Sequence, residues 1–232
     1  MGGIILKRRQ KLLWLLTLAF LFLGPGCYSN KAAVQDDKAP VTGISKIAVV
    51  GFQSAMSKGE KPDAVREPFS GKLIMASPVP REVAEKLSEI LFERLVQEKR
   101  YELVSPDQAM GAVSSIVDSD KDVGMDAVKI FQKVGKTFGC DAVLAGLIYR
   151  WREREGTAIG VNRSASVAFD LRLVRPSDGA ILWRSKFDKT QRSLTENLFE
   201  AGTFLQGGGV WMTAEKLGMI GLKKMLADMP GN

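Results

Sequence analysis

The sequence predicts an α/β fold in which a mixed β-sheet of about five strands is packed with amphipathic helices. Short β-branched runs alternate with helical stretches in the first part of the chain, a pattern typical of parallel strands joined by helical crossovers. Three alternating segments then follow one another across short turns, which requires antiparallel pairing. The 232 residues are 45% hydrophobic and 25% charged, which is sufficient for one folded domain with appendages.

The N-terminus is predicted to be an export signal covering residues 1–26. Four basic residues, Lys7, Arg8, Arg9 and Lys11, precede an apolar run from Leu12 to Leu23. A run of this length matches the ~7 to 15 residues of a signal-peptide core. It is too short for a membrane-spanning helix, which needs about 20 residues.

Cys27 is the candidate modification site. It follows Gly24-Pro25-Gly26 at the start of a polar stretch, which resembles the lipobox of bacterial lipoproteins. This resemblance implies that the Cys27 thiol is diacylated and becomes the mature N-terminus, so that a lipid attaches the protein to a membrane. Tyr28 stands where aspartate would retain an enteric lipoprotein in the inner membrane, which favours the outer membrane, facing the periplasm. A conventional secretory signal or an uncleaved anchor is the alternative.

The strand and helix pattern begins after a polar tether over residues 27–44, and a single domain is expected over residues 45–232. The β-branched segment Ser45–Phe52 is predicted to be the first, buried strand. Gln53–Pro78 lacks a sustained pattern and is predicted to be a long loop, our first candidate for a mobile contact surface. From Pro80 to Arg100, apolar residues recur every three or four positions, as in an amphipathic helix.

The remaining elements follow the same logic. A short strand is expected first, then two helices, three strands that form an antiparallel meander, and two final helices. Glycine-containing turns separate the three strands. In chain order, these elements are Tyr101–Val104, Asp107–Val117, Val123–Phe138, Asp141–Trp151, Ser166–Val174, Ile181–Phe187, Leu194–Leu205 and Trp211–Met229. In Asp141–Trp151, one face is expected to carry Val143, Ala145, Leu147, Tyr149 and Trp151.

The amino-acid composition limits the partners and the catalytic mechanisms that are open to the protein. The formal charge is +7, but residues 1–26 contain four basic residues and no acidic one, so 29 basic and 26 acidic residues remain. This balance gives no reason to expect a nucleic-acid partner. Histidine is absent, which excludes a Ser-His-Asp triad, a Cys-His pair and His-ligated metals. We expect no catalytic residues, no cofactor and no metal, and therefore not an enzyme.

Four local motifs have ordinary structural explanations. Gly135-Lys136-Thr137 copies the end of a phosphate-binding loop but ends a predicted helix instead of starting one. In Asp118–Gly124 the glycine comes one position too late for a calcium loop. Arginines alternate with Glu153 and Glu155, which is typical of a solvated strand edge. Cys140 is expected to be a small buried hydrophobe.

Five segments, taken in order, resemble a superfamily of bacterial envelope lipoproteins. They are residues 47–52, 100–104, 134–146, 169–174 and 178–183. The superfamily includes the curli secretion lipoprotein (CsgG-like) and the outer-membrane lipoprotein activators of penicillin-binding proteins (LpoB-like). The resemblance implies a periplasmic α/β domain that works by protein contact. The turns at 156–162 and 176–179 are too short to hold pore-forming hairpins.

The predicted function is therefore that of an accessory or regulator of envelope biogenesis, such as activation of a cell-wall synthase. Its expected partners are the membrane, through the lipid, and an envelope protein of unidentified kind. One alternative is a subunit of an oligomeric CsgG-like secretion or surface-assembly complex, which would make the protein a homo-oligomer. A second alternative is a periplasmic hydrolase, for which paired buried carboxylates would be the signature.

Overall fold

The computed structural model describes residues 43–57, 59–119, 126–157, 160–191 and 211–230, which lie in one compact unit. The predicted signal and Cys27, almost all of the predicted tether, and the predicted helix Leu194–Leu205 lie outside the described residues. Among the described residues, no helix combines the length and the apolar character needed to cross a membrane.

The main sheet has five strands in the order β4-β1-β5-β8-β9. Strand β1 runs parallel to both of its neighbours, whereas β8 runs antiparallel to β5 and to β9. The predicted mixed sheet with a closing antiparallel meander is confirmed. The bounds are β1 Lys46–Ser54, β4 Glu102–Val104, β5 Ala142–Arg152, β8 Ser166–Val174 and β9 Ile181–Thr190.

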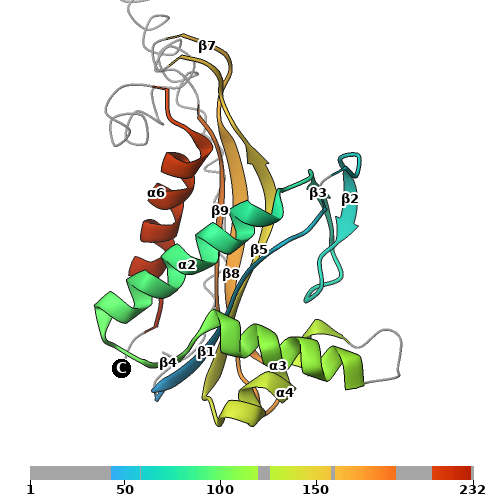
Figure 1. Ribbon diagram of the computed structural model, residues 1–232, viewed down its shortest axis with the longest axis vertical. Helices are drawn as coiled ribbons and strands as arrows, with labels where there is room; N and C mark the ends of the chain where they lie inside the picture. The colour runs from blue at the N-terminus through green and yellow to red at the C-terminus, as the bar shows by residue number, and fades with distance from the viewer. Residues whose placement is uncertain (1–42, 58, 120–125, 158–159, 192–210, 231–232) are drawn as a thin grey trace, which may run out of the picture. The chain divides into compact units, whose positions relative to one another are not determined.

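Two helices, α2 (Arg81–Glu98) and α6 (Ala214–Ala227), cover one face of the sheet (Figure 1). The predicted apolar stripe of α2 is buried there, with Leu87, Leu91 and Leu95 almost inaccessible to solvent. These leucines pack in one core with the odd-numbered apolar residues of β8, such as Phe169. The alternation of β8 therefore does place one set of side chains in a core, as period-2 patterning predicts.

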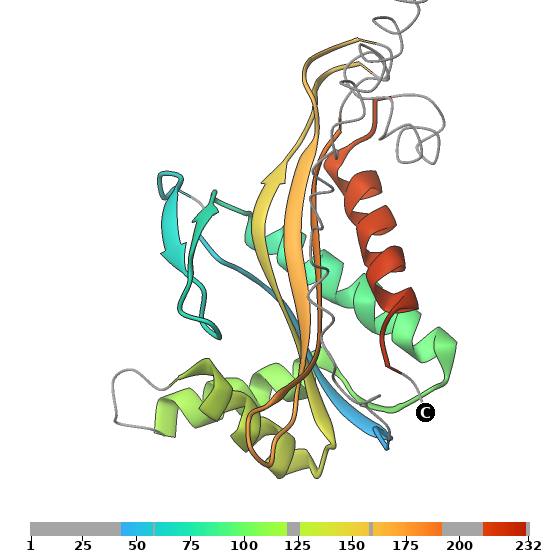
Figure 2. The same ribbon diagram turned by 180° about the vertical axis from the view of Figure 1, so that it is seen from behind.

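Two further helices, α3 (Pro106–Ser119) and α4 (Ala127–Phe138), lie on the opposite face (Figure 2). Helix α4 begins later than predicted because the Asp126 side chain accepts a hydrogen bond from the Val128 amide and caps the first turn. It ends as predicted at Gly139, whose φ of 61° gives the left-handed conformation of a helix stop.

Two β-bulges modify the predicted pattern. The bulge between Val49 and Gly51 gives Gly51 a φ of 82°, and an added Cβ would lie 2.5 Å from Ser88 Oγ. The bulge between Ile148 and Arg150 shifts the register of β5, so the prediction that Trp151 shares a face with Tyr149 is wrong. Trp151 packs against the α2/α6 core instead, because a bulge reverses the alternation beyond it.

The predicted loop Gln53–Pro78 contains a two-stranded antiparallel ribbon, so the prediction of an irregular segment is wrong in part. Its strands are β2 (Asp63–Arg66) and β3 (Leu73–Ala76). In Figures 1 and 2 this ribbon lies on the same side of the sheet as α3 and α4. A smaller ribbon, β6 (Glu155–Gly156) with β7 (Val161–Arg163), extends the turn between β5 and β8.

The start of β1 and the end of the described chain lie together. The Glu102 amide donates a hydrogen bond to the Ser45 carbonyl (2.8 Å), beside the first residues of β1. The neighbouring Tyr101 hydroxyl donates to the Pro230 carbonyl. The β2–β3 ribbon follows the other end of β1, so β1 separates the entry of the chain from the ribbon.

Candidate functional site

The turn that joins β2 to β3 is built around the carboxylate of Glu67. This carboxylate accepts hydrogen bonds from the amides of Phe69 (3.0 Å) and Ser70 (2.8 Å) and from the Ser70 hydroxyl (2.5 Å). The Gly71 amide donates to the Glu67 carbonyl (2.9 Å), and the Glu67 amide donates to the Lys72 carbonyl (2.8 Å). The turn is therefore closed by its own hydrogen bonds before it meets the sheet.

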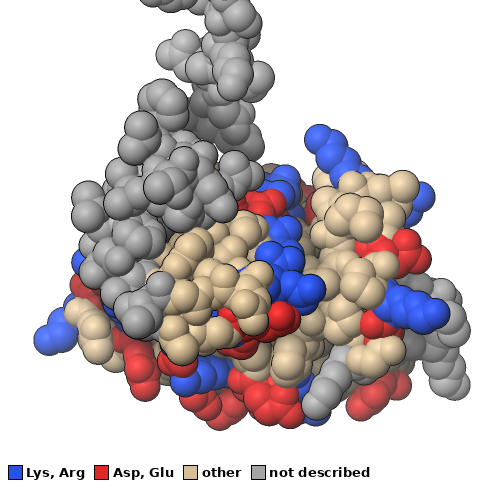
Figure 3. All heavy atoms as spheres, turned by 90° about the horizontal axis from the view of Figure 1, so that it is seen from above, with Lys and Arg blue, Asp and Glu red and all other residues tan. Residues whose placement is uncertain are grey.

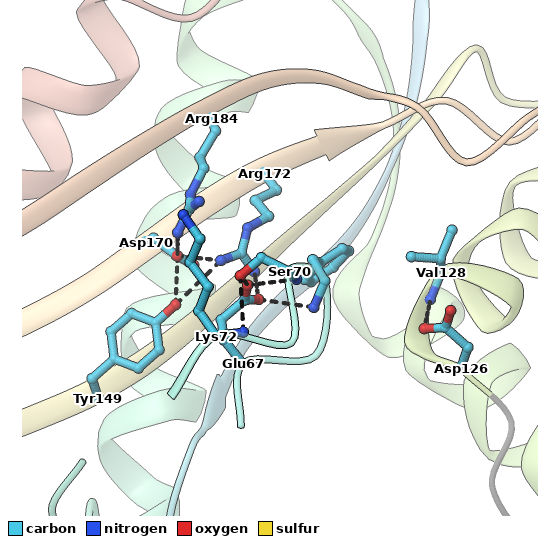
Figure 4. Close-up of polar contacts among 10 residues, drawn as sticks. Glu67, Ser70, Lys72, Asp126, Val128, Tyr149, Asp170, Arg172 and Arg184 are labelled. Atoms are coloured by element: carbon cyan, nitrogen blue, oxygen red, sulfur yellow. Dashed lines mark hydrogen bonds and ion pairs between the residues drawn. The ribbon is translucent and has the colours of Figure 1, made fainter. Parts of the chain in front are cut away.

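A buried charge network joins this turn to β8 (Figure 4). Arg172 lies between two carboxylates, with Nη1 2.8 Å from Glu67 Oε1 and Nη2 2.5 Å from Asp170 Oδ2. The Tyr149 hydroxyl donates to the same Asp170 oxygen at 2.5 Å, and Arg184 Nη2 lies 3.2 Å from it. The exposed fractions of Glu67, Asp170 and Arg172 are 1%, 0% and 1%.

Burial and hydrogen bonding shift the pKa values of this network in opposite directions. Burial raises the pKa of Asp170, although the contacts with Tyr149, Arg172 and Arg184 oppose that shift. Burial also acts to raise the pKa of Glu67, but the hydrogen bonds from Ser70 and Phe69 and the charge of Arg172 together lower it. Burial and the neighbouring Asp170 raise the pKa of Tyr149. The network therefore holds Glu67 as an anion.

Aromatic contacts reinforce the attachment of the turn. The guanidinium of Arg172 lies over the Phe69 ring, 4.3 Å from its centre. The Phe69 ring also stacks on Phe131 of α4, with centres 5.7 Å apart. The ribbon is thus attached to both β8 and α4, by charge at one side and by ring stacking at the other.

A small pocket lies under this turn, between the ribbon, α4 and the sheet. It has a volume of about 50 Å³ and is lined largely by apolar groups, including Phe69, Phe131 and Ala145. Pockets that hold small-molecule ligands usually measure about 300 to 1,000 Å³. This pocket therefore suits no more than a small side chain or a few water molecules.

The outer face of the ribbon exposes large apolar side chains. Leu73 and Met75, two residues apart on β3, are 66% and 69% exposed. Residues directly opposite each other on paired strands share a face, and the partners of these two residues are Arg66 and Ala64. All four residues are exposed, whereas Val65 and Ile74 on the other face of the ribbon are half-buried.

Two buried carboxylates, the expected signature of a hydrolase, are present as Glu67 and Asp170. Both are engaged by Arg172 and are almost inaccessible to solvent, so neither is open to a substrate in this structure. Within the described ranges, no group of three or more cysteine, aspartate or glutamate side chains could hold a metal ion. The arrangement is that of a structural ion network.

The structure places three of the other residues considered above in structural roles, whereas residues 120–124 of the Asp118–Gly124 motif lie outside the described residues. Cys140 is buried, and burial raises the pKa of its thiol. Gly135 lies near the end of α4, where an added Cβ would be 2.2 Å from Pro176. Glu153 is not merely part of a solvated edge, because its carboxylate accepts from the Ala214 amide (3.0 Å) at the start of α6.

Sequence reasoning missed Glu67, Asp170 and Arg172 as a unit. The alternation of β8 places Asp170 and Arg172 on one face, and that charged pair within an apolar strand was a usable signal. Their partner Glu67 could not be found in this way, because it lies in a segment without a strand pattern.

The fold is an α/β sandwich with a ribbon fixed to one face, and the known structures that resemble it do so only distantly. No family model matches the sequence, and no curated protein matches it. Solved structures with a similar fold include the C-terminal domain of LpoB from Salmonella enterica, with 16% identity and a TM-score of 0.38 over 65% of this chain and 86% of that one.

Two further solved structures also resemble this chain distantly. A PelC dodecamer from Paraburkholderia phytofirmans has 12% identity and a TM-score of 0.42, over 84% of this chain and 96% of that one. Lipoprotein GNA1162 from Neisseria meningitidis has 18% identity and a TM-score of 0.39, over 70% of this chain and 92% of that one. The expected likeness to LpoB is present as a distant structural similarity, and the likeness to CsgG stays a prediction.

Proposed function

We propose that this protein is a lipid-anchored accessory or regulator of envelope biogenesis that acts by protein contact through the outer face of the β2–β3 ribbon. The observation that carries the proposal is the combination of Leu73 and Met75, exposed on the ribbon, with the buried Arg172 network that fixes the ribbon in place.

The buried network supports a role for the outer face of the ribbon, because burying its charged groups costs free energy that apolar packing would avoid. Removing charged groups from water costs several kcal/mol per ion, and apolar packing of the same volume is often as stable or more stable. The ions here hold a short ribbon, and a two-stranded ribbon alone is marginal in water. A rigid ribbon with an apolar outer face loses little conformational entropy when a partner covers it.

The anchor is proposed at Cys27, which the lipobox resemblance identifies. The variant Cys27→Ser should no longer incorporate labelled fatty acid and should leave the membrane fraction, because its hydroxyl cannot take the thiol-linked lipid. Labelling and fractionation of cells that carry wild type or the variant test this point. A variant that still incorporates the lipid would contradict the anchor.

The contact function is tested by crosslinking in living cells. A photo-crosslinking amino acid at Ala64, on the outer face of the ribbon, should capture one discrete envelope protein. The same amino acid at Val117, which is 50% exposed on α3, is the matched control and should capture that protein weakly or not at all. Failure to capture a discrete protein from any of several exposed positions would contradict action by protein contact.

A further inference from the structure

The outer face of the ribbon has a chemistry that narrows the kind of partner. Its exposed side chains are Ala64, Arg66, Leu73 and Met75, so three apolar groups share this face with one guanidinium. Methionine and arginine are enriched in the cores of protein interfaces, where lysine, aspartate and glutamate are depleted. Two of the four residues, Arg66 and Met75, are therefore of types that interface cores favour, whereas alanine is depleted there.

Arg66 is the group on this face with unused binding capacity. Its Nη1 donates one hydrogen bond, to the Gly71 carbonyl at 2.7 Å, which orients the side chain against the turn. Across the residues that the structure describes, it makes no ion pair. A guanidinium has five N–H donors in a fixed planar fork that matches a carboxylate. Most of the N–H donors of Arg66 therefore remain available to bind a carboxylate beside Leu73.

A membrane surface fits this face less well than a protein does. Residues 60–76 contain three basic and three acidic residues, so the ribbon has no net charge to attract anionic lipid. Basic and acidic side chains are also interspersed on the face seen in Figure 3, without a broad patch of one sign. Specific pairing with a single complementary group is the better match.

We propose that the ribbon binds a different protein at a surface where an apolar patch adjoins a carboxylate, with the carboxylate paired to Arg66 and the apolar patch covering Leu73 and Met75. This inference rests on the proposed contact function and specifies the partner's chemistry. The hydrogen bonds around Glu67 and its ion pair with Arg172 present the face in one orientation, so Arg66 is positioned before the partner arrives.

The experiment uses the full-length protein in cells, with the photo-crosslinker at Ala64. Crosslinking yield is measured for wild type, Arg66→Lys, Arg66→Glu and Leu73→Ser. Arg81→Glu serves as the matched charge-reversal control, because Arg81 is exposed on α2 and its ion pair is with Glu85 of the same helix. All four positions that are altered are exposed, and urea unfolding of each variant confirms that the fold is retained.

We expect Arg66→Glu to lower the yield about tenfold or more, because it places two carboxylates together at the interface. Arg66→Lys should have a smaller effect, since it keeps the charge and loses the fork. Leu73→Ser should also lower the yield, and Arg81→Glu should leave it unchanged. Mass spectrometry then identifies the captured peptide, and changing the acidic residue beside it to lysine should restore capture by Arg66→Glu.

Three results would overturn the inference. The first is that Arg66→Glu captures the partner as well as wild type does, whereas Leu73→Ser loses capture. This result would leave the contact function intact but would contradict the proposed carboxylate on the partner. The second is an adduct to phospholipid or to a second copy of this chain. The third is no adduct from Ala64 while another position captures an envelope protein, which would move the contact surface away from the ribbon and contradict the proposed function as well.

Discussion

Replacement of Arg172 by methionine tests whether the buried network fixes the ribbon. Methionine keeps much of the apolar stem and removes the guanidinium, so Glu67 and Asp170 lose ion pairs of 2.8 and 2.5 Å. Breaking one buried ion pair by removing a partner costs about 3 to 5 kcal/mol. The Ser70 and Phe69 amides still bind Glu67, and Arg184 still contacts Asp170, so we expect the total to stay near about 3 to 5 kcal/mol and not to double.

The assay is urea unfolding of the detergent-solubilised full-length protein, followed by tryptophan fluorescence. With a slope of about 2 kcal/mol/M, a loss of this size lowers the urea midpoint by roughly 1.5 to 2.5 M. Arg81→Met is the control, since its exposed pair with Glu85 should contribute at most about 0.5 kcal/mol. The double variant Glu67→Gln, Arg172→Met should recover part of the loss, because it removes one uncompensated buried charge.

The reasoning would be refuted by a loss below about 1 kcal/mol in Arg172→Met, because breaking a buried ion pair costs more than that. It would also be refuted by strictly additive losses in the double variant, since residues of one network are expected to be coupled. The first result would mean that ring stacking and backbone pairing hold the ribbon without the ions, and the second would mean that Glu67 and Arg172 do not stabilise each other.

Four further predictions concern pH, backbone conformation and packing. The folded protein lowers the pKa of Glu67, so its stabilisation is present above the ordinary value of 4.5 and is lost as the pH falls through the folded pKa. The stability advantage of wild type over Glu67→Gln should therefore shrink between pH 7 and pH 3 in urea titrations; a constant difference would contradict it. Gly51→Ala should lose at least about 1 to 2 kcal/mol, because φ is 82° and the new Cβ would lie 2.5 Å from Ser88 Oγ. Gly111→Ala, in open space on α3, should instead gain about 0.5 to 1 kcal/mol, and a loss there would show that the helix position is wrong. Leu91→Ala, fully buried between α2 and the sheet, should cost about 2 to 5 kcal/mol in thermal or urea unfolding; a cost below about 1 kcal/mol would mean that Leu91 is not in the core.

Elements with a regular hydrophobic period could be predicted from the sequence. The apolar residues of β8 alternate with other residues, and those of α2 recur at three- and four-residue intervals. The hydrophobic pattern alone therefore predicts both elements. The two strands of the ribbon have four residues each and mix charged with apolar side chains, so no period was visible. The face of Trp151 was wrong because one bulge residue, which no pattern announces, reverses the alternation.

The candidate site also has a part that the sequence predicts and a part that it does not. The 53–78 segment is a candidate contact surface on its length and composition, and that stays a prediction. Its attachment to the sheet includes an ion pair between Glu67 and Arg172, which are far apart in the chain. Only the parallel pairing of β1 with β5, followed by β8, brings those two residues together. Cys27 stays a prediction, because it lies outside the described residues.

The direction of β1 gives the proposed anchor a geometric consequence. The tether joins the domain at the start of β1, and the ribbon follows its end, about 27 Å away at the usual rise per strand residue. Between Cys27 and Gly43, the chain can span at most about 55 Å. With the anchor proposed at Cys27 and the contact face proposed on the ribbon, attachment and contact lie toward opposite ends of β1, so binding of a partner at the ribbon leaves the entry of the chain into the domain uncovered.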